Sequence, residues 1–420
     1  MSAPAVRGRE RPPAPARAWW RPTAWPWWAQ TLAVWVATRA FSAVLLLVVA
    51  RTQEATVWTP ASPSYAQYTG AMWDASWYRL IAEEGYPDGL PVGPDGRVPQ
   101  TAWAFFPLFP ALVRAVVAVT GASWDVAAPT LALVLGTAAA LVVHRVVAAA
   151  VARSSLAPRV GRALPLASVA LLGASAAAPV LQVAYTESLA LLLLAAVLWC
   201  LVERWYLAAV PLVLGLGLTR AVALPVAVAV VAHGVARRRD ERAGGPSVPA
   251  GDWARLGALL AASGLAGVAW PALVGLLTGV PDAYARTQGA WRGRGEVVPL
   301  LPWVDVARFF TGPLWPVVLL AVLAAGTLVA SVGPIRRLGP ELWGWTAGYL
   351  AYLLVAIEPG TSLVRFVLLA FPLASVAAVW ALERPRPRAA LTSLLVAAAL
   401  TQVAWVALVW RLVPPAGWPP

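Results

Sequence analysis

One polar segment early in the chain combines a carboxylate with aromatic side chains that favour membrane interfaces. Asp74 is surrounded in sequence by three such residues: Trp73, Trp77 and Tyr78. A carboxylate held in this way can take a proton from a hydroxyl group, which is general base catalysis. Apolar residues at helical spacing predict a short amphipathic helix over residues 73–84, with Asp74 at its amino end. The competing interpretation is a helix-capping aspartate with no chemical role.

One glutamate and two arginines interrupt apolar sequence elsewhere in the chain: Glu187, Arg220 and Arg365. An arginine at the centre of a membrane-spanning helix costs roughly 2.5–3.5 kcal/mol, so intramembrane charges are usually functional. Arg220 is predicted at a turn between two short spans, where it could bind a phosphate group. Arg365 is a second candidate of this kind, and a pairing with Glu358 is its alternative. Glu187 is expected at the start of a helix, and both Glu187 and Arg220 also have purely structural interpretations.

The composition predicts a polytopic, all-α membrane protein. Of the 420 residues, 60% are hydrophobic and 12% are charged, which leaves long apolar runs that a soluble core cannot bury. The net charge of +13 comes from arginines between these runs, as in cytoplasmic loops, so no nucleic acid partner is expected. Cys200 has no second cysteine to pair with, and the isolated His144 and His233 give no zinc-ligand spacing. No cofactor is assigned.

Eleven apolar runs are predicted to cross the membrane. The first, from about 29 to 50, is too long for a signal-peptide core and is interpreted as an uncleaved helix after a cytoplasmic tail, residues 1–28. When the amino terminus is cytoplasmic, an odd number of crossings places every dense arginine loop on the cytoplasmic side. The other predicted spans are 128–151, 163–180, 185–203, 205–219, 221–236, 254–278, 314–332, 341–357, 361–381 and 389–412.

Residues 29–420 are expected to form one transmembrane domain with two outer loops, 51–127 and 279–313. Within the first loop, the segment 101–120 contains Phe106 and has two prolines near its start, which break helical hydrogen bonding. The segment is therefore predicted to be re-entrant or to lie on the outer surface rather than to cross. An ordinary kinked span is the alternative.

The predicted topology gathers the candidate residues on the outer face of the membrane. The second outer loop adds Arg286 and Trp291, a basic and aromatic composition that suits polar ligands near a membrane surface. One face that collects acids and arginines is a hypothesis for a functional site. The charged residues on that face are Asp74, Glu187, Arg220, Arg286 and Arg365.

Four motifs in a fixed order then give the chain a family resemblance: Trp73-Asp74-Ala75, the run AFFPLFP at 104–110, Tyr185-Thr186-Glu187-Ser188, and Thr219-Arg220. In order and spacing, residues 70–220 resemble PIG-V-like mannosyltransferases of the GT-C superfamily, bacterial branch. The resemblance implies a GT-C-like enzyme that moves a sugar, with mannose expected, from a polyprenyl phosphate carrier to a glycan, glycolipid or protein acceptor. It also implies inversion at the anomeric carbon, a site on the outer face of the bacterial plasma membrane, and Asp74 as the base.

The remaining candidate roles follow from this expected chemistry. The departing polyprenyl phosphate develops negative charge, which Arg220 and Arg365 are expected to stabilise. Some GT-C members have two adjacent acids where Ala75 follows Asp74 here, so a divalent metal is neither assigned nor excluded. Supporting or acceptor-binding roles are expected for Trp73, Trp77, Tyr78, Phe106, Glu187, Arg286 and Trp291.

Two other classes of function compete with this interpretation. In a transporter or flippase of lipid-linked sugars, Glu187, Arg220 and Arg365 would line a substrate path through the membrane lipid. The absence of a visible internal repeat in the sequence disfavours that class. In a non-catalytic scaffold of the cell envelope, the segment around Asp74 would only anchor the chain at the interface.

Overall fold

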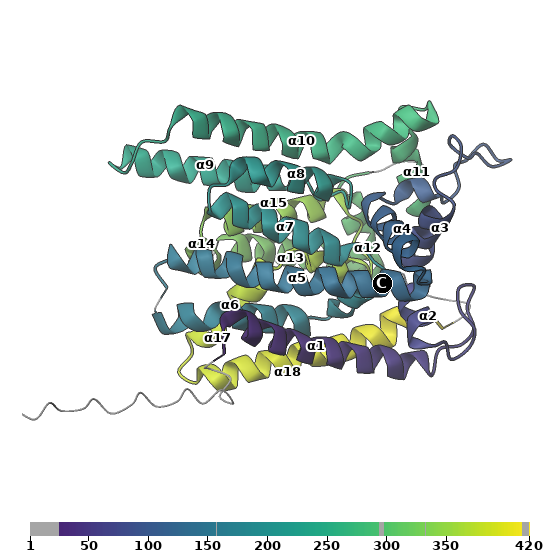
Figure 1. Cartoon of the computed structure of the whole chain (residues 1–420), viewed down its shortest axis with the longest axis horizontal. Helices are drawn as coiled ribbons and strands as arrows, with labels where there is room; N and C mark the ends of the chain where they lie inside the picture. The colour runs from purple at the N-terminus through teal and green to yellow at the C-terminus, as the bar shows by residue number, and fades with distance from the viewer. Residues whose placement is uncertain (1–24, 157, 294–297, 332, 414–419) are drawn as a thin grey trace, which may run out of the picture.

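The computed structural model of the chain describes residues 25–156, 158–293, 298–331, 333–413 and 420. Within these residues every regular element is a helix, which confirms the predicted all-α class. Most of the predicted tail, residues 1–24, lies outside the described residues. Figure 1 shows the long helices side by side along one common direction, with short elements gathered at one end.

Five helical stretches are long and apolar enough to cross a membrane. The first, α1 (Trp27–Ala50), has 24 residues and a length of about 36 Å, which exceeds the roughly 30 Å of a bilayer's hydrocarbon core. These stretches support the predicted membrane-embedded, multi-pass character. The other four are α5 (Trp124–Ala152), α10 (Ala250–Thr278), the run Leu301–Arg337, and the run Pro387–Trp410.

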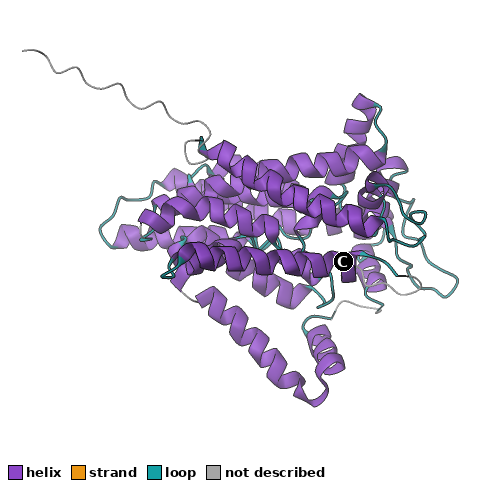
Figure 2. Cartoon of the chain, turned by 90° about the horizontal axis from the view of Figure 1, so that it is seen from below, coloured by secondary structure: helices purple, strands orange, loops and turns teal. Residues whose placement is uncertain are grey.

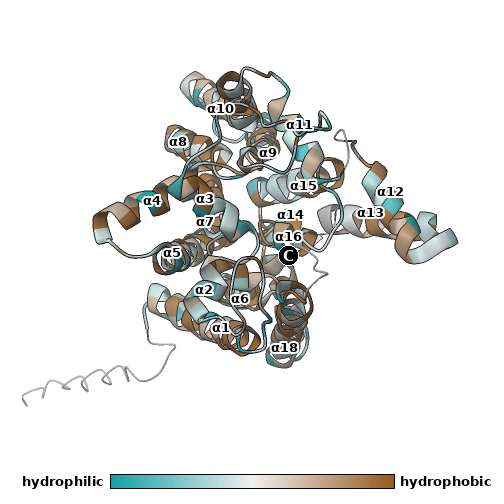
Figure 3. Cartoon of the chain, turned by 90° about the vertical axis from the view of Figure 1, so that its right-hand side faces the viewer, coloured by the Kyte–Doolittle hydropathy of each residue, from teal (hydrophilic) through white to brown (hydrophobic). Residues whose placement is uncertain are grey.

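The last two stretches contain more than one element. Figure 3 labels α12 and α13 to one side of the main bundle, and Figure 2 shows helices that project from the bundle. Few of the described side chains of α12 and α13 are buried. The first run consists of α12 (Leu301–Thr311), η4 (Gly312–Leu314), α13 (Trp315–Ser331) and α14 (Gly333–Arg337), and the second of α18 (Pro387–Trp405) and η5 (Val406–Trp410).

Shorter helices complete the bundle. Among them, α7 packs between α5 and α8, while α9 packs on α15 and α6 on α17. All run in the direction of the longer helices in Figure 1. Their bounds are α6 (Pro158–Ala174), α7 (Glu187–Val202), α8 (Tyr206–Gly217), α9 (Val226–Arg242), α15 (Pro340–Ala356) and α17 (Pro372–Leu382).

The two ends of the bundle differ in composition. One end, called here the α3 end, lies at the right of Figure 1 and carries α2, α3, α4 and α11. The opposite end, called here the arginine end, carries α14 and the α5–α6, α9–α10 and α17–α18 connections, so the arginine loops predicted to share one side lie together. The short elements not yet given bounds are α2 (Tyr65–Gly70), α3 (Asp74–Glu83), η2 (Ala102–Ala104), α4 (Leu108–Thr120), η3 (Ala178–Gln182), α11 (Ala283–Trp291) and α16 (Leu363–Val367).

Several local predictions can be compared with these elements. The amphipathic helix predicted over 73–84 is confirmed as α3. Segment 101–120 forms η2 and the 13-residue α4, which is about 20 Å long and lies across the end of the bundle in Figure 3, in agreement with a segment that does not cross. The predicted span 361–381 is wrong as one helix, because Pro372, which lacks a backbone N–H, begins the new helix α17 after α16.

Close packing of α15 on α9 supplies a first test of the fold. A Cβ atom added to Gly344 would lie 2.8 Å from the Cα of Ala229 and 2.8 Å from the Cβ of Ala232, so the two helices would have to separate. Gly344→Ala is expected to lower the free energy of unfolding by about 1–3 kcal/mol, measured by denaturation in detergent. The control is Gly264→Ala in α10, where no atom lies within 4 Å of the added group. Equal stability of both variants would contradict this packing.

Candidate active site

The amino end of α3 is held in an unusual backbone conformation. Trp73, the residue before the helix, has φ 58° and ψ −128°, a region that residues other than glycine rarely adopt. Its indole Nε1 donates a 2.8 Å hydrogen bond to the carbonyl of Trp410, and its ring packs 5.3 Å from that of Trp58. Contacts with distant parts of the chain therefore fix the point at which Asp74 enters the helix.

The Asp74 carboxylate is paired with a buried arginine. Its Oδ2 lies 2.6 Å from Nη2 of Arg365, and its backbone N–H donates to the Tyr185 hydroxyl at 3.2 Å. The Asp74 side chain is 18% exposed, whereas that of Arg365 is 7% exposed. The carboxylate thus lies at the edge of a buried polar cluster.

This pair continues into a row of alternating charges, called here the charged row: Asp74, Arg365, Glu187 and Arg220. Glu187 Oε1 accepts from Arg365 Nη1 at 3.1 Å and lies 2.7 Å from Arg220 Nη1. Its side chain is only 1% exposed, and its second oxygen, Oε2, has no hydrogen-bond partner. Two acids and two arginines balance one another, which is how buried charges avoid the large cost of lost solvation.

Four separate segments bring the charged row together. Asp74 begins α3, and Glu187 begins α7, where unpaired backbone N–H groups favour an anion. Arg220 lies in the connection between α8 and α9, as predicted, and Arg365 lies on the short α16. The polar side chains can meet because the four segments lie together at the α3 end, where the apolar bundle stops.

Aromatic and hydroxyl groups line the row. The Arg365 guanidinium lies 5.1 Å from the ring centroid of Tyr185 and 5.0 Å from that of Phe366, and Arg220 lies 5.2 Å from the same Phe366 ring. These distances are typical of cation–π contacts. Arg220 Nη1 also donates to the Thr186 hydroxyl at 2.9 Å. Rings and a hydroxyl therefore hold both guanidinium groups in fixed orientations.

Tyr78 connects the row to α3. Its hydroxyl lies 3.3 Å from that of Thr186, and its ring meets those of Tyr185, Phe105 and Phe109 edge-on. Burial raises the pKa of the Tyr78 phenol above its ordinary value, so the hydroxyl stays protonated and can donate a hydrogen bond.

The other predicted residues divide into two groups. Trp77 and Trp291 contact each other, with ring centroids 5.2 Å apart, beside α3. Phe106 instead packs with Trp270 in a second aromatic cluster, and Arg286 is exposed on α11, so neither belongs to the charged row.

Several residues of the site were not predicted from sequence. Tyr185 and Thr186 directly precede Glu187, so their position in that motif was a signal that could have been used. Phe366 follows Arg365 within an ordinary apolar run, and Trp410 lies near the far end of the chain. Nothing in the sequence around these two residues indicates that they support Asp74 and Arg365.

An apolar groove borders α16, the short helix that carries Arg365. It has a volume of about 610 Å³ and lies between α6, α16, α17 and α18. Leu363 and Val364, which line it, immediately precede Arg365 on α16. Its lining is almost entirely aliphatic, which suits an apolar chain.

Among the described residues, no group of three or more histidine, cysteine, aspartate or glutamate side chains could hold a metal ion.

Comparison of the chain with protein-family models and with curated proteins gives no match. The fold and the site therefore define a helical, membrane-embedded protein with a buried acid–arginine cluster at one end. The PIG-V-like resemblance remains a proposal.

Charge balance in the row gives a second test. Glu187→Gln leaves two arginines with only Asp74 as an anion, which is expected to cost about 3–5 kcal/mol of stability. Removing Arg220 as well restores neutrality, so Glu187→Gln with Arg220→Gln is expected to be more stable than Glu187→Gln alone. Thermal unfolding in detergent measures both.

The control for this test is Glu83→Gln, which breaks an exposed pair with Arg79 on α3. Such surface pairs contribute only about 0.3–0.5 kcal/mol. If the double variant were less stable than Glu187→Gln, charge balance would not explain the arrangement of the row.

Proposed function

We propose that this chain is an integral-membrane glycosyltransferase. It transfers a sugar, with mannose as the first candidate, from a polyprenyl phosphate carrier to an acceptor hydroxyl at the outer face of the bacterial plasma membrane. The observation that supports this most is the contact between a partly exposed carboxylate, Asp74, and a buried arginine, Arg365, beside an apolar groove. One site then combines a proton acceptor, a phosphate-binding cation and space for a lipid chain.

Asp74 is the proposed base. An acceptor hydroxyl is a poor nucleophile, and a carboxylate that takes its proton in the transition state typically contributes 10²–10⁴-fold to the rate. The acceptor oxygen forms a bond to the anomeric carbon as the bond from that carbon to the phosphate oxygen breaks. The hydroxyl proton passes to Asp74, and the bonding electrons leave with the phosphate, so the reaction inverts the anomeric centre.

Arg365 and Arg220 are the proposed phosphate ligands. A guanidinium group matches the geometry of phosphate oxygens and binds them through charge-assisted hydrogen bonds. While Arg365 Nη2 contacts Asp74 Oδ2 at 2.6 Å, that oxygen is occupied. Binding of the donor phosphate draws Arg365 toward the phosphate and releases Asp74 for the acceptor. Donor binding therefore precedes removal of the hydroxyl proton.

The groove beside α16 is the proposed site for the start of the isoprenoid chain. A polyprenyl phosphate needs an apolar surface that ends at a cationic group. The groove provides aliphatic side chains, among them Leu363 and Val364, which precede Arg365 on α16, while the bilayer surrounds the rest of the chain.

The orientation of the protein is part of the proposal. In the proposed topology eleven helices cross the membrane: α1, α5, α6, α7, α8, α9, α10, α13, α15, α17 and α18. The arginine end then faces the cytoplasm by the positive-inside rule, and the α3 end with its charged row faces outward. The arrangement resembles the GT-C plan of a membrane bundle with its site at the outer surface.

A flippase or transporter of lipid-linked sugars is the second candidate. The buried charges of Glu187 and Arg220 and the groove beside α16 also suit a path for a lipid-linked substrate. A base is needed only for transfer, so the role of Asp74 separates the two classes of function.

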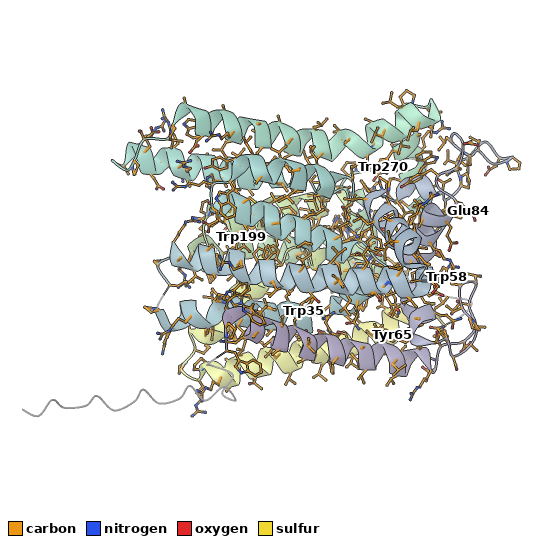
Figure 4. The ribbon with its side chains drawn as sticks, in the orientation of Figure 1. Trp35, Trp58, Tyr65, Glu84, Trp199 and Trp270 are labelled. Carbon is orange, nitrogen blue, oxygen red and sulfur yellow. The ribbon has the colours of Figure 1, made fainter. Side chains whose placement is uncertain are left out.

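The decisive measurement is sugar transfer by membranes supplied with labelled polyprenyl phosphate mannose. Asp74→Asn is expected to reduce transfer by about 10²–10⁴-fold, because the amide cannot take the proton. The matched control is Glu84→Gln, an exposed carboxylate at the end of the same helix that points away from the bundle in Figure 4, and it is expected to retain full activity. Movement of the labelled lipid across the bilayer without transfer to any acceptor would favour the flippase.

Binding of the product lipid gives an independent test. Asp74→Asn removes the anion that competes for Arg365, so purified Asp74→Asn protein is expected to bind labelled polyprenyl phosphate as tightly as the natural chain or more tightly. Arg365→Gln is expected to weaken that binding by about tenfold or more, as for loss of a hydrogen bond to a charged group. Unchanged binding by Arg365→Gln would remove Arg365 from the phosphate site.

A further inference from the structure

Three aromatic rings from separate segments form one surface beside the charged row, called here the aromatic platform. Trp77 on α3 stacks on Phe105, with ring centroids 5.7 Å apart and an angle of 10° between the planes. Trp291, the last residue of α11, meets both rings edge-on at 5.2 and 5.3 Å. Phe105 is buried, whereas Trp77 and Trp291 are half-buried, so the two indoles keep accessible surface.

The platform adjoins the proposed base. Trp77 stands three residues after Asp74 on α3, so the two side chains occupy neighbouring positions on the helix surface, with Cβ atoms about 5–6 Å apart. A single ring separates the platform from the charged row, since Tyr78 meets Phe105 edge-on at 5.3 Å and its hydroxyl lies 3.3 Å from that of Thr186.

Membrane anchoring does not account for this arrangement. Trp25, Trp27 and Trp28 at the start of α1 are 37–50% exposed, as is usual for tryptophans that anchor a chain at the lipid boundary. Trp77 and Trp291 instead contact one another and a buried phenylalanine, Phe105. Polar groups lie next to them on α11, where Gln288 donates to the carbonyl of Ala104.

We infer that the acceptor is a carbohydrate whose sugar ring stacks on one of the two indoles, Trp77 or Trp291, and contacts the edge of the other. A pyranose ring presents C–H groups on its faces and hydroxyl groups around its rim. Indole rings bury such a face, while the rim hydroxyls reach polar groups. A sugar on the platform directs a rim hydroxyl toward Asp74, one helical turn away. This inference rests on the proposed function and narrows its acceptor to a glycan or glycolipid.

Binding of a sugar probe tests the platform without any transfer reaction. The probe is octyl α-mannopyranoside, detected by saturation-transfer NMR with the full chain in nanodiscs, and an octyl tetraethylene glycol ether serves as the amphiphile without a sugar. Saturation of the sugar protons is expected with the natural chain. Trp77→Leu and Trp291→Leu are each expected to weaken binding by about tenfold, while Trp77→Phe retains most of it.

The matched control is Trp205→Leu. Trp205 pairs with Trp199 at 5.6 Å, is 51% exposed and belongs to the connection between α7 and α8, toward the arginine end, where Figure 4 labels Trp199. Its loss removes an accessible indole from a tryptophan pair outside the site, and it is expected to leave sugar binding unchanged. Denaturation in detergent checks that each variant is folded. If a leucine variant is not folded, Trp291→Phe is measured in its place.

Kinetics separate the inference from the proposed function. If the natural chain transfers sugar, Trp77→Leu is expected to raise KM for a glycoside acceptor about tenfold with little change in KM for the donor. Transfer to a serine-containing peptide that is unaffected by Trp77→Leu would overturn the carbohydrate acceptor while leaving the transferase intact. Equal sugar binding by the natural chain and both leucine variants would also overturn it, whether or not transfer occurs.

Discussion

The Arg365 guanidinium, held between two carboxylates, is the interaction on which the site depends. It pairs with Asp74 at 2.6 Å and with Glu187 at 3.1 Å, and Glu187 in turn holds Arg220. In a buried region an unpaired charge is too costly to keep, so these four side chains can be accommodated only together. Four segments that are distant in sequence must therefore end at the same depth in the bundle.

This requirement explains features that look irregular in isolation. The break between α16 and α17 lets Arg365 turn inward on a short helix instead of lying along a continuous span. The connection between α8 and α9 lets Arg220 reach Glu187 from outside the regular helices. The positive φ of Trp73 sets the direction of α3, and the hydrogen bond to the carbonyl of Trp410 stabilises that conformation.

The sequence predicted those parts of the site that depend on local patterns. The helical spacing of apolar residues was enough to predict α3, and a charge within a long apolar stretch was enough to locate the turn that contains Arg220. The pairing of Asp74 with Arg365 could not be predicted in this way, because only the packing of the bundle brings the two residues together. Nothing near either residue specifies the other, and Glu358, a nearer acid in sequence, was the obvious partner for Arg365. Trp410 was missed for the same reason, since only the packing of the bundle brings its carbonyl to Trp73 and its ring to within 5.4 Å of that of Tyr185.

Charge balance also links the two halves of the proposed reaction. The charged row is neutral before the substrate binds, so a donor phosphate can bind Arg365 only in competition with Asp74. When Asp74 takes the acceptor proton it loses its charge, so it no longer competes for Arg365 as the departing phosphate becomes more negative. Arg365 then interacts more strongly with the phosphate in the transition state than in the ground state, which is the condition under which an interaction accelerates a reaction. Proton uptake and phosphate departure thereby assist one another through one guanidinium group. Glu187, which has Arg220 as a second partner, keeps the row paired while Arg365 moves between its anions.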